Sequence, residues 1–436
     1  MAATAAAPPA ERLLANRDFA RLFAAQAASL VGSGVTSVAL AAFAYQLAGR
    51  NATAVVGAAL ALRILAFVTL SPIAGVLADR VDRKRMLIAA DLLRVSLLGA
   101  FPFVTAVWHV YGLIFAINAV TAFFTPAFEA SIPALVGDRL YTRAVALSRV
   151  AVDLEAIAGP LVAGVLIALV GVRWTFWFDG LTYLASALLV WRARVPRAPR
   201  PTSPFPWGEF VPQVTHGTRV LLREPALRQA LVLHFAEAAA GAAAIVATVA
   251  YVRDVLGRGE TSFALAMAAV GAGSSVTALV LARRGPGVDR RSAGGSSGSA
   301  GAREKLSEHL RFHRSASRTL LLGGALLALA LLPGALVPPY AALLVLWAIN
   351  GAGQALIAIP SVGLLARHTA PDERGRAYAA HFALTHLFWL LTYPAVGFLG
   401  RAVGTPWTFT MAGLTAAAAT GLAATLAGPH RPHSVG

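Results

Sequence analysis

The sequence predicts an all-α polytopic membrane protein of twelve transmembrane helices arranged as two six-helix bundles. Hydrophobic residues make up 57% of the 436 residues and charged residues only 13%, whereas a soluble domain is nearer half apolar and a quarter charged. The apolar residues also form long runs, such as 113–125, 161–172 and 320–332. With their neighbours, these runs reach the roughly 20 residues that an α-helix needs to cross the hydrocarbon of a bilayer.

The hydrophobic runs fall into two groups of six expected helices. In the first half these are 18–48, 53–78, 85–107, 111–136, 148–171 and 174–193. In the second half they are 227–252, 261–283, 318–337, 340–366, 377–400 and 405–427. We therefore expect an N-terminal bundle over 1–193, a cytoplasmic central loop over 194–225 and a C-terminal bundle over 226–436. A flexible cytoplasmic loop is expected over 285–317, because its Gly/Ser tract is typical of a linker. Within this loop, Glu304–Arg314 could form a short surface helix.

The net charge of +17 reports topology. Most of the 37 Lys and Arg residues fall on alternate loops and on the termini. This distribution predicts that those loops and both termini lie in the cytoplasm and that the protein spans the inner membrane. A nucleic-acid partner is not expected, because the basic residues are not concentrated on one soluble domain. The chain has no cysteine, which excludes disulfides and thiolate metal sites.

The most specific motif lies between the second and third expected helices and reads Gly75-Val-Leu-Ala-Asp79-Arg80-Val-Asp82-Arg83-Lys-Arg. Glycine permits close helix packing, and a carboxylate can accept hydrogen bonds from the amides at a helix N-terminus. The segment resembles the cytoplasmic loop signature of the major facilitator superfamily, with Asp82 where most members have glycine. The resemblance implies a conformational latch in which Asp79 meets the start of helix eleven, after Asp372-Glu373, and the arginines pair with carboxylates. Plain positive-inside topology is the alternative.

Two further stretches narrow the resemblance to drug/proton-antiporter-like exporters, which include macrolide and siderophore efflux proteins. Asp91-Leu-Leu-Arg94 matches their Asp-x-x-Arg pattern in helix three and forms an i,i+3 pair that can neutralise itself in the membrane. Gly159-Pro160-Leu-Val-Ala-Gly164 in helix five is similar to their antiporter motif, although alanine replaces one glycine. The resemblance implies a gating helix. A kinked helix packed through small residues is the other reading.

Ionisable residues inside the membrane are costly and tend to be functional. Arg63 and Glu237 are expected near the midplane, one from each half, and are plausible partners. Acidic residues nearer the cytoplasmic ends are Glu129, Asp153 and Glu155. A carboxyl group in surroundings of low polarity readily takes up a proton, so these residues are candidates for proton coupling. A static buried ion pair is the alternative.

Helix eleven carries an aromatic and histidine-rich stretch that contains His381, His386, Trp389 and Tyr393. It resembles the nickel-resistance permeases of the same superfamily, although their long His-rich tail is reduced here to a stub at His430 and His433. His234 and Glu237 share one face of helix seven. Imidazole with carboxylate suits Ni²⁺, Co²⁺ or Zn²⁺, so these residues are candidates to bind a metal or another substrate. Hydrogen-bonded interior histidines are the alternative.

The sequence contains neither a Walker loop, which needs Gly-Lys-Ser/Thr, nor a catalytic or dinucleotide-binding pattern. We therefore expect no enzyme activity and no cofactor. The predicted function is proton-coupled efflux of a small toxic solute by alternating access, the solute being a drug-like compound or a divalent metal ion such as nickel or cobalt. The expected partners are this solute, protons and the lipid bilayer, and the protein is expected to be monomeric. A non-transporting sensor or scaffold, or an importer or facilitator, remains as an alternative.

Overall fold

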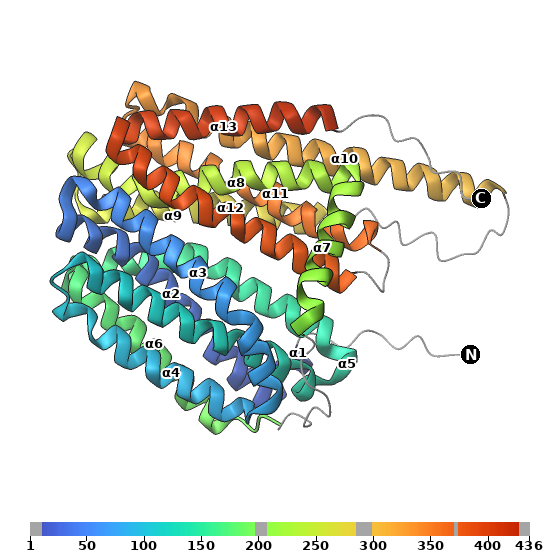
Figure 1. Ribbon diagram of the computed structural model, residues 1–436, viewed down its shortest axis with the longest axis horizontal. Helices are drawn as coiled ribbons and strands as arrows, with labels where there is room; N and C mark the ends of the chain where they lie inside the picture. Colours follow the sequence, from blue (N-terminus) through green and yellow to red (C-terminus); the bar gives the residue numbers. More distant parts are fainter. Residues whose placement is uncertain (1–10, 197–206, 285–298, 370–373, 427–436) are drawn as a thin grey trace. The chain divides into compact units, whose positions relative to one another are not determined.

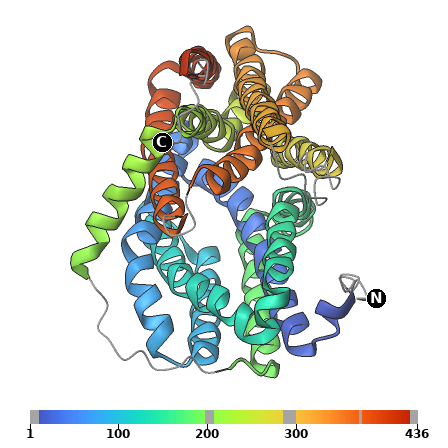
Figure 2. The same cartoon turned by 90° about the vertical axis from the view of Figure 1, so that its right-hand side faces the viewer.

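The computed structural model describes residues 11–196, 207–284, 299–369 and 374–426, and these are almost entirely helical (Figure 1). Their contacts divide the chain into two compact units. Unit 1 comprises Met1–Phe205 and Val252–Ala268, and unit 2 comprises Pro206–Tyr251 and Ala269–Gly436. Within each unit the long helices run roughly side by side, which is clearest in a view along their axes (Figure 2).

The main helices of unit 1 come from the first half of the chain. They are α1 (Glu11–Leu14), α2 (Arg17–Ala48), α3 (Ala52–Arg80), α4 (Arg83–Gly99), α5 (Val107–Val170) and α6 (Val172–Arg192). Short 3₁₀ turns, η1 (Gly49–Asn51) and η2 (Phe101–Phe103), lie at the ends of α2 and α4. Packing centres on α2, which contacts α3, α5 and α6.

Unit 2 contains the helices of the second half. They are α7 (Trp207–Arg223), α8 (Pro225–Ala250), α10 (Ser299–Leu331), α11 (Tyr340–His368), α12 (Arg374–Val403) and α13 (Thr405–Leu426). The 3₁₀ turn η5 (Leu332–Leu336) follows α10. Between α8 and α10, the π-helical turn η3 (Tyr251–Val255) and α9 (Glu260–Arg284) cross the boundary between the two units. Helix α8 contacts α10, α11, α12 and α13, and its alanine-rich sequence lets these neighbours approach closely.

Each of the twelve expected spans coincides with a helical stretch. Ten helices in the described part of the chain are long and apolar enough to cross a membrane, and Ala158–Val170 is a shorter apolar helix. The outer surfaces of the units carry large exposed apolar side chains, including Trp108, Leu169 and Leu181. Such a surface is unfavourable in water and favourable in lipid. The protein is a multi-pass membrane protein.

Helices four and five of the prediction are continuous in the structure as the 64 residues of α5. The helix nevertheless reverses direction, because Thr121 and Ser148 line the same cavity. A straight helix would separate these two residues by about 40 Å along its axis. The expected hairpin is therefore present, but it is built from bent helix instead of a loop.

Two stretches expected as cytoplasmic loops contain helical segments. The central loop 194–225 contains α7, which packs against α12 and α8 at a steep angle to α8 (Figure 1). Helix α10 already begins at Ser299, so residues 299–317 of the expected flexible loop are helical, while 285–298 lie outside the described residues. The short surface helix expected over Glu304–Arg314 is part of α10, whereas α7 was not predicted, because the composition of a linker nearby does not exclude a helix a few residues further on.

Aromatic side chains organise the two cores. In unit 1, Phe101 stacks on Phe176 with ring centroids 4.1 Å apart, and Phe43 meets both rings edge-on. In unit 2, the buried Trp347 indole donates a hydrogen bond of 3.0 Å to Thr248 and lies edge-on to Phe409. These contacts hold the packed helices around the polar residues of the bundle interiors.

Candidate functional site

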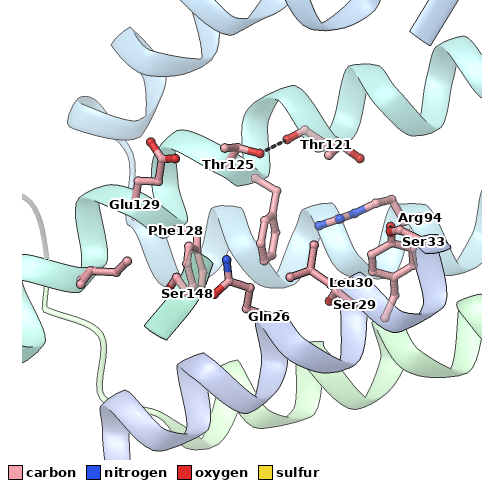
Figure 3. Close-up of a pocket in the computed structure, with 13 residues that line it drawn as sticks. Gln26, Ser29, Leu30, Ser33, Arg94, Thr121, Thr125, Phe128, Glu129 and Ser148 are labelled. Atoms are coloured by element: carbon pink, nitrogen blue, oxygen red, sulfur yellow. Dashed lines mark hydrogen bonds between the residues drawn. The ribbon is translucent and has the colours of Figure 1, made fainter. Parts of the chain in front are cut away.

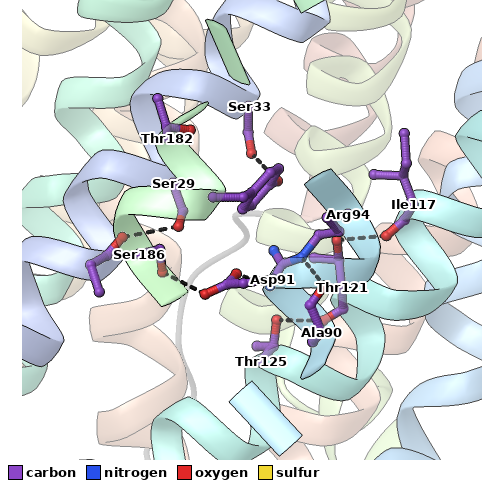
Figure 4. Close-up of polar contacts among 12 residues, drawn as sticks. Ser29, Ser33, Ala90, Asp91, Arg94, Ile117, Thr121, Thr125, Thr182 and Ser186 are labelled. Atoms are coloured by element: carbon purple, nitrogen blue, oxygen red, sulfur yellow. Dashed lines mark hydrogen bonds and ion pairs between the residues drawn. The ribbon is translucent and has the colours of Figure 1, made fainter. Parts of the chain in front are cut away.

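A buried ion pair lies at the centre of unit 1. Asp91 and Arg94 are on neighbouring turns of α4, and Arg94 Nη2 lies 2.8 Å from Asp91 Oδ1. Both side chains are almost completely buried. The second carboxylate oxygen of Asp91 accepts a hydrogen bond of 2.7 Å from Ser186 on α6 (Figure 4). The pair expected from the Asp-x-x-Arg spacing is thus formed, and its role in a latch stays a prediction.

Two aromatic rings enclose the Arg94 guanidinium. Its Cζ lies 4.3 Å from the centroid of the Phe124 ring and 4.2 Å from that of Tyr183. The faces of aromatic rings attract cations. Together with Asp91, the rings compensate the positive charge of Arg94 within the bundle, so Arg94 contributes little net charge to its surroundings.

Polar contacts continue from Tyr183 along α2. The Tyr183 hydroxyl is 2.8 Å from that of Ser33, and one turn further along α2 Thr36 donates a hydrogen bond of 2.6 Å to the buried carboxylate of Asp179. Thr182 also donates to Asp179. Buried polar groups are expected to be paired in this way, so α2, α4 and α6 are held in a fixed register.

A cavity of about 370 Å³ opens beside this network within unit 1. Arg94 lies at one end of the cavity and Glu129 at the other (Figure 3). Among the described residues, the lining combines apolar and aromatic side chains with hydroxyls, one amide and two charged groups. It comprises Gln26, Ser29, Leu30, Ser33, Arg94, Thr121, Phe124, Thr125, Phe128, Glu129, Ile132, Ser148 and Tyr183. A largely apolar concavity with a few polar groups is the usual form of a small-molecule site.

The remaining candidates for proton coupling lie elsewhere. Arg63 lines a second, smaller cavity of unit 1 together with Asp179 and Tyr183. Glu155 lies on α5, where its side chain borders Gly34 of α2. The side chain of Asp153 lies outside the described part of the structure. Arg63 belongs to unit 1 and Glu237 to unit 2, and their expected partnership stays a prediction.

The helix-five motif lies at a close contact between helices. Gly159 meets Gly34 of α2 backbone to backbone, and neither position has room for a side chain. Pro160 is buried next to it. Gly164 faces Ala264 of α9, whose methyl group would lie 3.1 Å from a Cβ atom at position 164. Small residues therefore allow these helices to pack closely, as the packing alternative expected, and the gating role stays a prediction.

The expected latch is described only in part. Gly75, Asp79 and Arg80 lie on the last turns of α3, but their side chains are outside the described part of the structure, as is Asp372-Glu373. Arg83 opens α4. Asp82 is the N-cap of α4 and accepts a hydrogen bond of 3.2 Å from the Arg85 amide. N-capping gives a physical reason for aspartate at this position, where glycine was expected.

Histidine and carboxylate meet in unit 2. His234 Nδ1 lies 2.6 Å from Glu237 Oε2 on the same face of α8, and the ring of His381 on α12 stands edge-on to His234 at 4.8 Å. His386 is one turn beyond and donates to the Phe382 carbonyl at 2.8 Å. Among the described residues no three His, Cys, Asp or Glu side chains are grouped as metal ligands.

The aromatic residues expected with these histidines also lie on α12. The Trp389 indole packs into the space above Gly241 of α8, where a Cβ atom would lie 2.3 Å from the ring. Trp389 and Tyr393 are neighbours, with ring centroids 5.1 Å apart. Trp389 thus packs at the α8–α12 contact, and the expected substrate role of Trp389 and Tyr393 stays a prediction.

Within unit 1, a polar cluster joins the C-terminal end of α2 to the segment 252–268. The Tyr45 hydroxyl donates to the carboxylate of Asp254, and the Arg253 guanidinium lies over the Tyr45 ring at 4.9 Å. The Glu260 carboxylate accepts a hydrogen bond of 3.0 Å from Gln46 Nε2 and forms an ion pair with the Arg253 guanidinium at 3.4 Å. We call these five residues the α2-end cluster.

Comparison with known proteins identifies the family. Residues 6–289 match the family described as "Transmembrane secretion effector", and residues 311–436 match the family described as "Major Facilitator Superfamily". The chain belongs to the major facilitator superfamily. This is a family of transporters, not of enzymes, in agreement with the expectation from the sequence.

Several superfamily members are similar to this chain along part or most of its length. An uncharacterised major-facilitator-type transporter of Bacillus subtilis, YfiS, is 25% identical over 80% of this chain and 79% of its own. Macrolide efflux protein A of Streptococcus pyogenes is 29% identical over 41% of this chain and 45% of its own. The multi-drug resistance efflux pump PmrA of Streptococcus pneumoniae is 33% identical, over 27% of this chain and 30% of its own.

Solved structures share the superfamily fold at low identity. A crystal structure of the peptide transporter POT in complex with sulfate superimposes with a TM-score of 0.71 and 13% identity, over 96% of this chain and 98% of that one. A bacterial homologue of the human lysosomal transporter Spinster, in an inward-facing and unoccupied conformation, gives a TM-score of 0.69 and 12% identity over 94% and 97%. At these identities the likeness concerns the fold alone.

Some residues of the candidate site in this superfamily member were not predicted from its sequence. They include the cavity residues Gln26, Thr125 and Ser148, and the α2-end cluster. A signal for the cavity was present, because Gln26, Ser29 and Ser33 recur at helical spacing within an otherwise apolar helix. The α2-end cluster left no such signal, since its members lie about 200 residues apart in the chain.

Proposed function

We propose that this protein exports a small toxic organic solute across the inner membrane by alternating access, coupled to proton entry, with both termini in the cytoplasm. The cavity of unit 1 is the observation that carries the proposal. Its volume of about 370 Å³ lies at the lower end of the roughly 300–1,000 Å³ of ordinary ligand pockets. Its wall joins phenyl rings to hydroxyl groups, which suits an amphiphilic compound.

The names of two relatives support export as the direction of transport. Two of the similar proteins are named as efflux proteins, for macrolides and for multiple drugs. Their similarity to this chain covers less than half of either protein, so export enters here as part of the proposal. Export also suits the entry of an amphiphilic solute from the cytoplasm or from the inner leaflet of the bilayer.

The driving force is proposed to be a proton gradient. Candidate proton carriers are Glu155 in unit 1 and Glu237 in unit 2, the latter hydrogen-bonded to His234. Arg63 of unit 1 and Glu237 of unit 2 lie within helices that are apolar enough to span a membrane, and ionisable residues within such spans commonly mark proton paths. A monomer suffices for this mechanism, since superfamily transporters alternate between two bundles of one chain.

An organic solute is favoured over nickel or cobalt by the described geometry. A transition-metal site needs several converging nitrogen or oxygen ligands. In unit 2 the described side chains offer His234 and Glu237 as a pair already bonded to one another, and His386 bonds to a carbonyl of its own helix. A non-transporting sensor has no comparable support, because it would not need a solute-sized cavity.

A vesicle assay tests the proposal. Inside-out vesicles that contain the protein are energised to an acid interior and followed with a pH-sensitive dye. Ni²⁺, Co²⁺, lipophilic cations and macrolides are added one at a time, with Asp79→Asn vesicles as the control. We expect organic compounds to trigger proton release and the metals not to. Release with the metals alone would overturn the organic substrate, and silence with every compound would overturn proton-coupled export.

A further inference from the structure

Helix α7 of unit 2 lies along the surface of the membrane instead of crossing it. Its last residue, Arg223, is separated from α8 by Glu224 alone. Helix α8 is long and apolar enough to span the membrane and begins at Pro225, so the junction of the two helices lies at a boundary of the bilayer. There α7 turns away from α8 at a steep angle (Figure 1). A helix with this position and direction rests at the level of the lipid headgroups.

The last two turns of α7 present a packed face and an outer face. Gly217 and Leu221, which are one turn apart, are buried, and α7 packs against α8 and α12. Arg219 and Arg223, also one turn apart, are exposed, and so is Leu222 with 49% of its surface accessible. Two arginines beside an exposed leucine are typical of a helix face that meets headgroups and the upper part of the acyl chains.

Positive charge continues from α7 onto the first turn of α8. Arg228 lies one turn after Glu224, and its Nε atom is buried without a hydrogen-bond partner among the described residues. This atom can only donate, so it requires an acceptor. The carboxylate of Glu224 is in contact with His368 of α11, with 3.5 Å between Oε2 and Nδ1. We call residues 219–228 the α7–α8 corner, and its described side chains include three arginines and one carboxylate.

We propose that the α7–α8 corner binds the phosphate group of an anionic phospholipid. Arg219 and Arg223 hold the phosphate from the surface, Arg228 supplies the inner donor, and Leu222 lies against the acyl chains. Charge complementarity selects this partner, because phosphate oxygens accept hydrogen bonds and the guanidinium fork binds them through two parallel N–H donors. A zwitterionic lipid has the same phosphate, but its own cationic group cancels most of the attraction. The proposal goes beyond export and holds whatever solute the protein transports.

The test compares two lipids with the same acyl chains on the purified full-length protein. Delipidated protein in neutral detergent is titrated with dioleoylphosphatidylglycerol, which is anionic, or with dioleoylphosphatidylcholine, which is zwitterionic. Native mass spectrometry measures the affinity of the first lipid bound, and the unfolding temperature reports stabilisation of the folded state by a ligand. We expect phosphatidylglycerol to bind more tightly and to raise the unfolding temperature further, and high salt to reduce this difference.

Variants assign the preference to the corner. Each basic residue near an anionic membrane surface contributes roughly fivefold to affinity, so Arg219→Gln with Arg223→Gln should weaken binding of phosphatidylglycerol about thirtyfold. The matched control is Arg17→Gln with Arg192→Gln, which removes two exposed arginines from unit 1 and changes the net charge equally. Arg228→Lys keeps the charge but lacks the Nε donor, and it should weaken binding severalfold. Unfolding temperatures without lipid show that each variant is folded.

Equal affinity of the double variant and its control for phosphatidylglycerol would overturn the proposal, as would equal stabilisation by the two lipids. Glycerol phosphate carries the phosphate without acyl chains, and we expect it to leave the unfolding temperature unchanged. Protection by glycerol phosphate as strong as that by the lipid would mean that the corner binds a soluble phosphate, and the lipid assignment would fail. Export is judged separately in the vesicle assay, so its failure leaves the lipid site standing.

Discussion

Gly159 of α5 and Gly34 of α2 lie in direct backbone contact. A Cβ atom on Gly159 would lie 2.6 Å from Cα of Gly34, and one on Gly34 would lie 2.9 Å from Cα of Gly159. The neighbour in each case is backbone, which cannot move aside as the end of a side chain can. The glycine of the helix-five motif is therefore required by the packing of the first helix of unit 1, whatever its part in gating.

Gly159→Ala should accordingly destabilise the protein. Overpacking of a close contact costs typically about 1–3 kcal/mol, and we expect a lower unfolding temperature in detergent together with reduced transport. Gly112→Ala on the same helix is the control, because a Cβ atom there meets nothing within 4 Å. Equal unfolding temperatures of the two variants would show that the α2–α5 contact adjusts freely.

Asp91→Asn should be strongly destabilising. It leaves the Arg94 guanidinium buried without its counter-charge, and breaking a buried pair from one side costs about 3–5 kcal/mol. The double variant Asp91→Leu with Arg94→Leu removes both charges and should unfold at a higher temperature than Asp91→Asn. Thermal unfolding followed by tryptophan fluorescence measures both. A double variant less stable than the single one would argue against charge compensation as the function of the pair.

A disulfide should form between Gly164→Cys and Ala264→Cys. The chain has no native cysteine, so no competing thiol is present. The Cβ separation of 3.1 Å is a few tenths of an ångström below the usual range of about 3.5–4.5 Å, and a small shift of either helix brings it into range. Loss of free thiols on oxidation, counted by mass spectrometry, is the measurement.

The same disulfide tests movement of the segment 252–268 relative to α5. If transport requires the two to separate, oxidation should abolish flux in vesicles and a reductant should restore it. Gly112→Cys with Ala264→Cys is the control and should stay reduced, because no atom lies near a side chain at position 112. Full transport by the oxidised protein would mean that this contact is kept throughout the transport cycle.

Tyr45→Phe should weaken the α2-end cluster. The substitution removes the hydroxyl that donates to Asp254 and leaves the ring in place under Arg253. A hydrogen bond to a charged group contributes about 1.5–3 kcal/mol, and exposure of this site to solvent places the loss at the lower end. The unfolding temperature of the purified protein reports it. Tyr378→Phe on α12 is the control, because the exposed Tyr378 hydroxyl makes a long hydrogen bond of 3.4 Å, to the neutral Val362 carbonyl.

Glu237→Gln should uncouple transport from protons. The substitution keeps a hydrogen-bonding side chain beside His234, 2.6 Å away in the structure, but removes the ionisable group. We expect proton release in vesicles to be lost while the protein is still inserted in the membrane. Glu224→Gln should retain proton release. Normal release with Glu237→Gln would remove this residue from the coupling proposal.

Much of the fold followed from the sequence alone. The length and apolarity of the runs predicted the helices, because a bilayer requires each span to satisfy its own backbone hydrogen bonds. The spacing of Asp91 and Arg94 predicted their pairing, since residues three apart on a helix are neighbours. The motif around Asp79 and the helix-five glycines indicated the superfamily to which the chain belongs.

The tertiary structure decided which distant residues meet. Only the reversal of α5 brings Thr121 and Ser148 to one cavity, and only the packing of α2, α4 and α6 places Tyr183 over Arg94. Local periodicity in the sequence indicates which face of a helix is polar. It does not indicate which other helix packs against that face. That pairing depends on close packing of the whole bundle, and it determines that the Arg94 guanidinium is enclosed by the rings of Phe124 and Tyr183.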